Sequence, residues 1–161
     1  MKSEYYNIVN DIINNKDYMR LKSEVHHYSY ERYSHCIDVS YKVYRVCKRL
    51  HLDYVSATRA AVVHDYFFNE EFSDKSKFYR ITHHHEKALA NACEITSLSS
   101  KEKNIISSHM FPIGGVLPRC LESVIVDLID DVVALKEVVS CRYHLIKNVA
   151  YCLVVCVLFW K

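Results

Sequence analysis

The chain of 161 residues is most simply one domain, long enough to bury a hydrophobic core without disulfides. Half of the residues are apolar and 25% are charged, which excludes an intrinsically disordered chain. The net charge of +2 does not indicate a broad nucleic-acid surface, and it leaves a small anionic substrate open.

The cysteines indicate a reducing compartment. There are seven, none in a C-x-x-C pair, and an odd number cannot all pair within one chain. Residues 1–19 mix charged and polar side chains and lack the apolar segment of a secretory signal. We therefore expect a cytoplasmic protein whose thiols serve as small hydrophobic side chains.

The distribution of helix breakers favours helices. Both glycines and both prolines lie in the stretch MFPIGGVLP (110–118), so the rest of the chain lacks the usual breakers. We therefore expect an all-α fold, in a single domain that covers 1–161.

Helical spacing of apolar residues predicts a first helix near 3–20 and a second from about Tyr30 to Leu50. The apolar face of the second comprises Ile37, Tyr41, Tyr44 and Cys47. The residues that face mainly away are basic and form a solvated face: Lys42, Arg45, Lys48 and Arg49. The N-terminal helix is expected to pack on the domain.

The middle of the chain predicts three further elements. A buried helix covers about 54–67, and a polar loop over 69–80 then leads into the helical stretch HHHEKALANACEI (83–95). The stretch SSKEKNIISSHM (99–110) opens with serine caps and an acidic first turn, which is typical of a helix start.

A long helix is predicted over 119–139, and it is apolar on nearly every side. One face comprises Leu121, Val124, Ile125, Leu128, Val132 and Leu135. Another comprises Val126, Ile129 and Val133. Three aspartates in such a helix, Asp127, Asp130 and Asp131, need a physical reason.

The C-terminal stretch 149–160 is apolar throughout. A membrane span needs about 20 such residues, so we favour a buried element over 140–160, packed on the domain, over a membrane or partner contact. Its β-branched residues leave helix or strand open, and the rest of the chain favours helix.

His64 and Asp65 stand side by side in the apolar stretch AAVVHDYFFN (60–69). An ionised carboxylate buried alone costs several kcal/mol, so Asp65 needs a cation, a proton or hydrogen-bond donors. Imidazole with carboxylate is a common ligand set for iron, manganese, zinc and cobalt. Adjacent helical residues point about 100° apart, so further ligands must come from elsewhere in the chain.

Histidines and aspartates recur in order on the expected helices. They are His35, His64 with Asp65, the cluster His83–His85, His109, and one of Asp127, Asp130 and Asp131. A helical bundle builds a metal site from side chains on facing helices. Four other histidines are treated as surface or core residues: His26, His27, His51 and His144.

This ordered set resembles the HD-domain metal-dependent phosphohydrolase superfamily, which is named for the His-Asp doublet. The resemblance covers 28–137 and includes the motifs YSHCIDVSYKVYRV, HHEKALANA, KEKNIISSHMFP and ESVIVDLID. With these motifs the chain is similar to a small bacterial branch of single-domain HD proteins. The resemblance implies an HD-domain helical bundle of about six to eight helices.

The resemblance also implies a ligand set. In the superfamily the first histidine, the doublet and the last aspartate hold one metal ion, which here implies His35, His64, Asp65 and Asp130. Two further histidines mark members with two ions, and these map to His84 and His109. The resemblance thus implies one or two divalent ions (Fe, Mn, Zn or Co), with Asp65 bridging both, and Asp65 and His64 as catalytic residues.

The HHH cluster leaves a choice of register, because His83, His84 and His85 point in three directions around a helix start. We choose His84 from its distance to the following Ala88 and Leu89, as in related sequences. His83 and His85 would then face solvent or support the ligands.

The final aspartate leaves a similar choice. Asp127 and Asp131 fit an ordinary polar stripe, whereas Asp130 matches the family motif. Relatives often carry a lysine just after this aspartate, and Asp131 stands there instead. This departure is expected to weaken phosphate binding or to change the charge around the metal.

Two ions about 3.5 to 4 Å apart lower the pKa of a shared water toward neutrality and clamp phosphate oxygens. We therefore expect a metal-dependent phosphohydrolase that cleaves a nucleotide or other small phosphoester with a metal-activated water or hydroxide. The chain has no glycine-rich phosphate loop. Candidate ligands of the substrate phosphate are Arg32, Lys87 and Arg119.

Two other hypotheses stay open. The chain could be a metal-loaded module that senses a nucleotide or binds a partner with little turnover, which Asp131 and the apolar C-terminal stretch support. A purely structural metal site ranks last, because structural sites tend to be closed and tetrahedral. We expect no specific nucleic-acid partner and no membrane span, and the sequence leaves the oligomeric state open.

Overall fold

The computed structural model describes residues 2–24 and 31–159, with side chains as far as Tyr143. Within these ranges the chain is helical and contains no β-strand, which confirms the expected all-α fold. The α-helices are α1 Lys2–Ile13, α2 Lys16–Met19, α3 Arg32–Arg49, α4 Tyr54–Val63, α5 Lys77–Ile95, α6 Ser100–Ser108 and α7 Leu121–Phe159. Two 3-10 helices, η1 Arg20–Ser23 and η2 Asn69–Phe72, complete the set.

Several expectations fall on residues outside this description. They concern His26, His27, the helix start at Tyr30, and the side chain of His144. His51 is described: it is exposed and follows α3 with a positive φ of 56°, a backbone conformation that often ends a helix.

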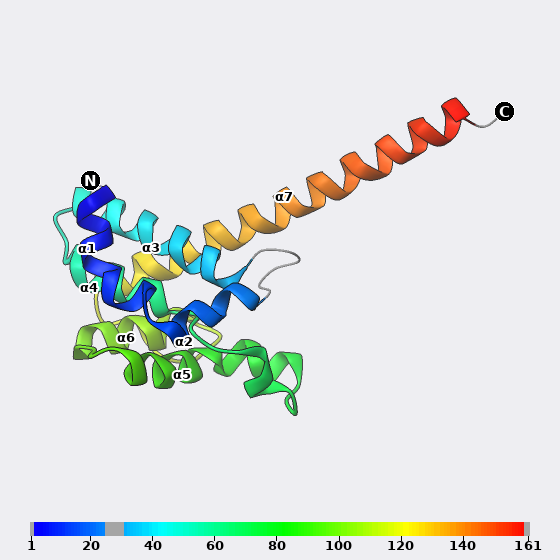
Figure 1. The fold of residues 1–161 in the computed structure, drawn as a ribbon. Coiled ribbons are helices and arrows are strands. Elements are labelled where there is room, and N and C mark those ends of the chain that lie inside the picture. Colours follow the sequence, from blue (N-terminus) through cyan, green and yellow to red (C-terminus); the bar gives the residue numbers. More distant parts are fainter. Residues whose placement is uncertain (1, 25–30, 160–161) are drawn as a thin grey trace.

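Helices α1 to α6 gather into one body, and α7 begins against that body and then leads away from it (Figure 1). Helix α4 is central, since it contacts α1, α3, α5, α6 and α7. Its buried residues Ala57, Ala60 and Ala61 are small, which lets neighbouring helices approach closely. The core therefore forms around α4, and the end of α4 is held in place by helices on several sides.

The helix expected over 3–20 is interrupted at Asn14 and Asn15, which corrects the prediction. The Asn15 side chain accepts hydrogen bonds from the backbone N–H groups of Asp17 and Tyr18 at the start of α2. An asparagine side chain competes with the helix for such donors and so favours a cap. After the break, Tyr18 is buried and donates its hydroxyl hydrogen to the carbonyl of Val62.

The polar loop expected over 69–80 is largely helical, which is a second correction. Its first residues form η2, and its last residues already belong to α5. The reason is a cap that lies inside the predicted loop: Ser76 accepts a hydrogen bond from the Tyr79 N–H. The start predicted for α6 is confirmed, because Ser99 and Glu102 bond reciprocally in a capping box.

The buried helix expected over 54–67 ends earlier, at Val63. His64 and Asp65 lie in the turn that follows, where the Tyr66 N–H donates to the carbonyl of Val63. Both members of the doublet are buried. The doublet therefore projects from the end of α4 rather than from its side.

The helix predicted over 119–139 is confirmed as α7, which begins at Leu121 and continues through the apolar stretch to Phe159. The backbone there is helical, as favoured, but the side chains from His144 onward lie outside the description. The expected packing of 140–160 on the domain therefore stays a prediction. Over the part of the chain that the structure describes, no helix has both the length and the apolar character that a membrane crossing requires.

The two apolar faces of α7 have different surroundings. Val126 and Val133 are buried, and Ile129 packs against the core. The other face is largely exposed: Leu121, Val124, Leu128, Val132 and Leu135. The sequence pattern did not distinguish the faces, because both are equally apolar.

Candidate metal centre

The first group of candidate ligands joins three helices. His35 lies on α3, His64 follows the last residue of α4, and Asp130 lies on α7. Nε2 of His35 is 2.8 Å from Oδ1 of Asp130, and Nε2 of His64 is 3.3 Å from the same oxygen. Both histidines are buried. One carboxylate oxygen therefore faces two imidazole nitrogens.

A second group adjoins the first through the His64–Asp65 doublet. Oδ1 of Asp65 lies 3.1 Å from Nε2 of His84 on α5 and 3.6 Å from Nε2 of His109 at the end of α6. The ligand atoms of His64, Asp65 and His109 all lie within 4.8 Å of one another. The same limit holds for His35, His64 and Asp130, so His64 belongs to both groups.

The outer ring nitrogen of each histidine in these groups bonds to a fixed oxygen. For three of them it is a backbone carbonyl on the preceding turn: Ala61 for His64, Arg80 for His84, and Ile106 for His109. A carbonyl only accepts, so Nδ1 carries the proton and a neutral ring turns its Nε2 lone pair inward. Metal-binding histidines are oriented in this way.

The facing nitrogens of His84 and His109 test whether these residues fit a metal. Their Nε2 atoms are 3.1 Å apart. Two lone pairs at this distance repel unless a cation or a proton lies between them. The buried Nε2 of His64 lies 3.3 Å from Asp130 Oδ1 but makes no hydrogen bond of good geometry within the described part of the chain. Imidazole nitrogen and carboxylate oxygen suit Fe, Mn, Co or Zn, so the residues fit one or two divalent ions.

The charges of the first group are strongly coupled. Burial disfavours the ionised form of Asp130, but His64 and His35 outweigh burial and hold its pKa far below the usual range. Burial also lowers the pKa of His35, but its hydrogen bonds to Asp130 and Glu137 outweigh burial and raise that pKa to about 10. A metal ion that binds His35 must therefore displace a proton.

Glu137 is a candidate that sequence reasoning missed. Its Oε1 lies 3.0 Å from Nδ1 of His35, and its side chain is buried. It follows Asp130 by two helical turns, so both acids face α3. The spacing of two acids in an apolar helix is the sequence feature from which Glu137 could have been predicted.

His84 is the member of the HHH cluster that the structure brings to the other candidate ligands. His83 is half-buried and stacks on Tyr79, with the ring centroids 4.0 Å apart. His85 is buried beside Gly114, and its pKa falls to about 4 because of burial and the nearby imidazoles of His109 and His84. His85 thus lies beneath the 110–118 loop rather than facing solvent.

The three aspartates of α7 have different positions. Only Asp130 meets the candidate ligands, whereas Asp131 is exposed. Asp127 is half-buried, and its pKa rises to about 6 because of burial and the neighbouring charges of Asp131 and Asp130. One helix therefore places three acids in three environments.

The three candidate phosphate ligands have other surroundings. Arg32 is buried, and its guanidinium donates to the carbonyl of Phe67 and to Asn69 Oδ1. Lys87 pairs with Glu71 at 3.2 Å. The Arg119 side chain is exposed. Among the interactions described for residues 2–24 and 31–143, none joins one of these groups to a candidate metal ligand, and their role stays a prediction.

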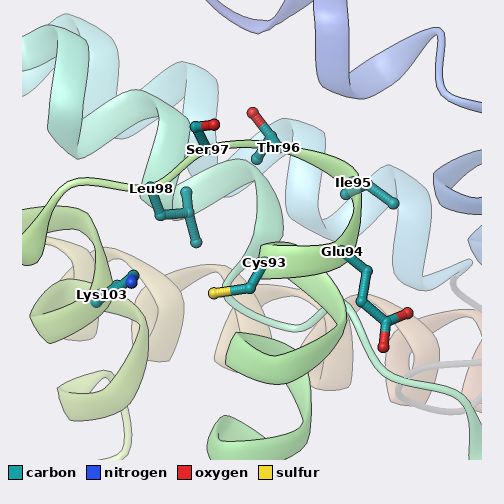
Figure 2. Close-up of a pocket in the computed structure, with 7 residues that line it drawn as sticks. All are labelled: Cys93, Glu94, Ile95, Thr96, Ser97, Leu98 and Lys103. Carbon is teal, nitrogen blue, oxygen red and sulfur yellow. The ribbon is translucent and has the colours of Figure 1, made fainter.

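A shallow hollow lies elsewhere, at the turn from α5 to α6 (Figure 2). It is lined by Cys93, Glu94, Ile95, Thr96, Ser97, Leu98 and Lys103. None of these is a candidate metal ligand. The hollow is therefore separate from the His–Asp groups.

The fold and this centre define an all-helical protein whose buried imidazoles and carboxylates can hold divalent metal. The family model for the HD domain matches residues 32–135, more than half of the chain. The chain therefore belongs to the HD domain family, whose members are generally metal-dependent hydrolases. This confirms the family expected over 28–137. No curated protein and no solved structure matched the chain.

Proposed function

We propose that the chain is a divalent-metal phosphohydrolase that cleaves a nucleotide or another small phosphoester. The observation that carries the proposal is the meeting of His35, His64 and Asp130 with Asp65, His84 and His109 in two adjoining groups, of which only Asp130 is partly exposed. Bound divalent ions would supply an acidified water and would neutralise charge on phosphate oxygens.

The two groups suggest how the residues share the ions. His35, His64 and Asp130 would hold one ion, and His84 and His109 the other. Asp65 would contact both, since its ligand oxygen lies within 4.8 Å of the ligand nitrogen of His64, and Oδ1 lies 3.1 Å and 3.6 Å from Nε2 of His84 and His109. In this role an ionised Asp65 has the cations that its buried position requires.

The protein's own groups would keep these ligands in their metal-binding form. The carbonyls of Ala61, Arg80 and Ile106 hold protons on the outer nitrogens of three rings, which leaves the inner nitrogens as ligands. Burial of the histidines limits competing water and strengthens electrostatic interactions inside the centre.

The experiment compares Asp65→Ala with the exposed matched variant Asp74→Ala. We expect Asp65→Ala to lose bound Fe, Mn, Co or Zn, measured by elemental analysis, and to lose hydrolysis of phosphomonoesters and phosphodiesters with added manganese. Asp74→Ala should retain both. Full activity in Asp65→Ala would refute the role of that carboxylate.

A second function is a metal-loaded module that binds a nucleotide or a partner with little turnover. The engagement of Arg32 with Phe67 and Asn69, and of Lys87 with Glu71, favours it, because these cations are already paired. So does Asp131 in place of the lysine of relatives. A screen of nucleotides by thermal stabilisation separates the two: a rise in Tm without product supports the binding module.

A further inference from the structure

The exposed apolar face of α7 repeats every seven residues. Leu121, Leu128 and Leu135 are 65%, 58% and 64% exposed, although leucine is ordinarily buried. Four residues after each stands a β-branched residue: Ile125, Val132 and Val139. Val132 and Val139 are 63% and 57% exposed, and Ile125 is partly buried. A contiguous apolar stripe of this length on one helix marks an interaction surface.

The repeat is that of a coiled coil. Leucine occupies the d position of each heptad, and isoleucine or valine occupies the a position, a combination that favours two parallel strands. The a/d stripe is thus Leu121, Ile125, Leu128, Val132, Leu135 and Val139. Arg142 takes the next d position and interrupts the pattern, while the helical backbone continues to Phe159.

The α7 residues that face α3 and the candidate ligands fit the same register. Val126 and Val133 take b positions, and Asp130 and Glu137 take f positions, which point away from a coiled-coil partner, whereas buried Glu122 takes an e position. A partner on the a/d stripe would therefore leave the contacts to α3 and the His–Asp groups undisturbed. Since α3 contacts α7 through the f positions Asp130 and Glu137, two bodies would lie on the outside of such a pair.

The charged residues beside the a/d stripe favour a second copy as the partner and a parallel orientation of the two helices. Asp131 takes a g position and Lys136 the e position five residues later, and in a parallel pair these positions face each other across the stripe. Both are exposed, and neither forms an ion pair with a side chain that the structure describes. An antiparallel pair would instead set g against g, where Asp131 would meet Val124 or Val138. In a parallel pair, Asp131 of each copy would face Lys136 of the other, which gives two ion pairs.

We propose that this chain forms a homodimer through a parallel two-stranded coiled coil along Leu121–Val139 of α7. The a/d stripe of one copy packs against the a/d stripe of the second copy. The dimer does not depend on the hydrolase proposed above.

The first test is sedimentation velocity over a range of concentrations, with the full chain. We expect a dimer for the wild type and a monomer for Leu128→Asp/Leu135→Asp, whose dissociation constant should rise about 100-fold or more. Leu117→Asp, at a residue 63% exposed outside α7, is the matched control and should remain dimeric. Both changed leucines are exposed, so metal content and the helical signal of the body should persist.

The second test reads direction and charge. Asp131→Lys should weaken the dimer, and the added change Lys136→Asp should restore it. In a parallel pair Leu135 faces its own copy, so Leu135→Cys should give an oxidised dimer in higher yield than wild type. A wild type that stays monomeric overturns the proposal, whether or not it binds phospholipid vesicles. So does a dimer that survives Leu128→Asp/Leu135→Asp, or a charge swap without restoration.

Discussion

Nε2 of His84 faces Nε2 of His109 at 3.1 Å, although the two histidines are 25 positions apart in the chain. Each ring has its other nitrogen bonded to a carbonyl of its own helix, so neither can turn away without losing a hydrogen bond. This pair is held in a geometry that favours a cation between the rings.

Replacing His84 should therefore remove one ion rather than both. We expect His84→Ala to bind about half the metal of the wild type, because His35, His64 and Asp130 keep the first group. Elemental analysis after removal of free metal measures the ratio. His83→Ala, which changes the neighbour stacked on Tyr79, is the control and should keep full loading. Equal loss in both variants would contradict the assignment of His84.

Glu137 should act on metal binding through His35. Glu137→Ala removes the acceptor that orients Nδ1 of His35 and should lower metal affinity about 10- to 100-fold, as for other partners of ligating histidines. Glu137→Gln retains an acceptor and should recover part of the affinity. Competition with a chromogenic chelator measures both variants. An unchanged affinity in Glu137→Ala would show that His35 needs no orientation from α7.

Metal affinity should rise with pH. The metal-free protein holds a proton on His35 up to a pKa of about 10, because Asp130 and Glu137 outweigh burial. Below that pH each ion bound at the first group releases this proton, so affinity should increase about tenfold per pH unit for each proton released. Titrations with manganese from about pH 6 to about pH 8 measure the slope. A flat profile would mean that metal binding does not displace the proton of His35.

Gly114 should tolerate no side chain while His85 is present. A Cβ on Gly114 would lie 3.0 Å from His85 Cε1 and 3.1 Å from Met110 Cβ, so Gly114→Ala should cost about 1–3 kcal/mol of unfolding free energy. The same change in a His85→Ala background should cost less. Gly115→Ala is the control: Gly115 has φ 74° and open space, so its cost is backbone strain that His85→Ala should not relieve. Chemical denaturation measures the three single variants and the two double variants.

The sequence by itself determined the helical class, the family and the order of histidines and aspartates along the helices. Helical spacing and the scarcity of helix breakers are local properties, and the His-Asp doublet with its flanking motifs can be recognised in the sequence alone. The capping box of Ser99 and Glu102 was predictable for the same reason, since all its atoms belong to one turn.

Only the tertiary structure decided which of several equivalent residues face one another. The directions of the helices brought His84, already chosen from the HHH cluster, to Asp65 and His109. They also brought Glu137, which sequence reasoning missed, to His35, a contact over 102 positions. They placed one apolar face of α7 in the core and left the other in solvent. These outcomes depend on how neighbouring helices pack, and helical periodicity specifies the faces of a helix but not what covers them.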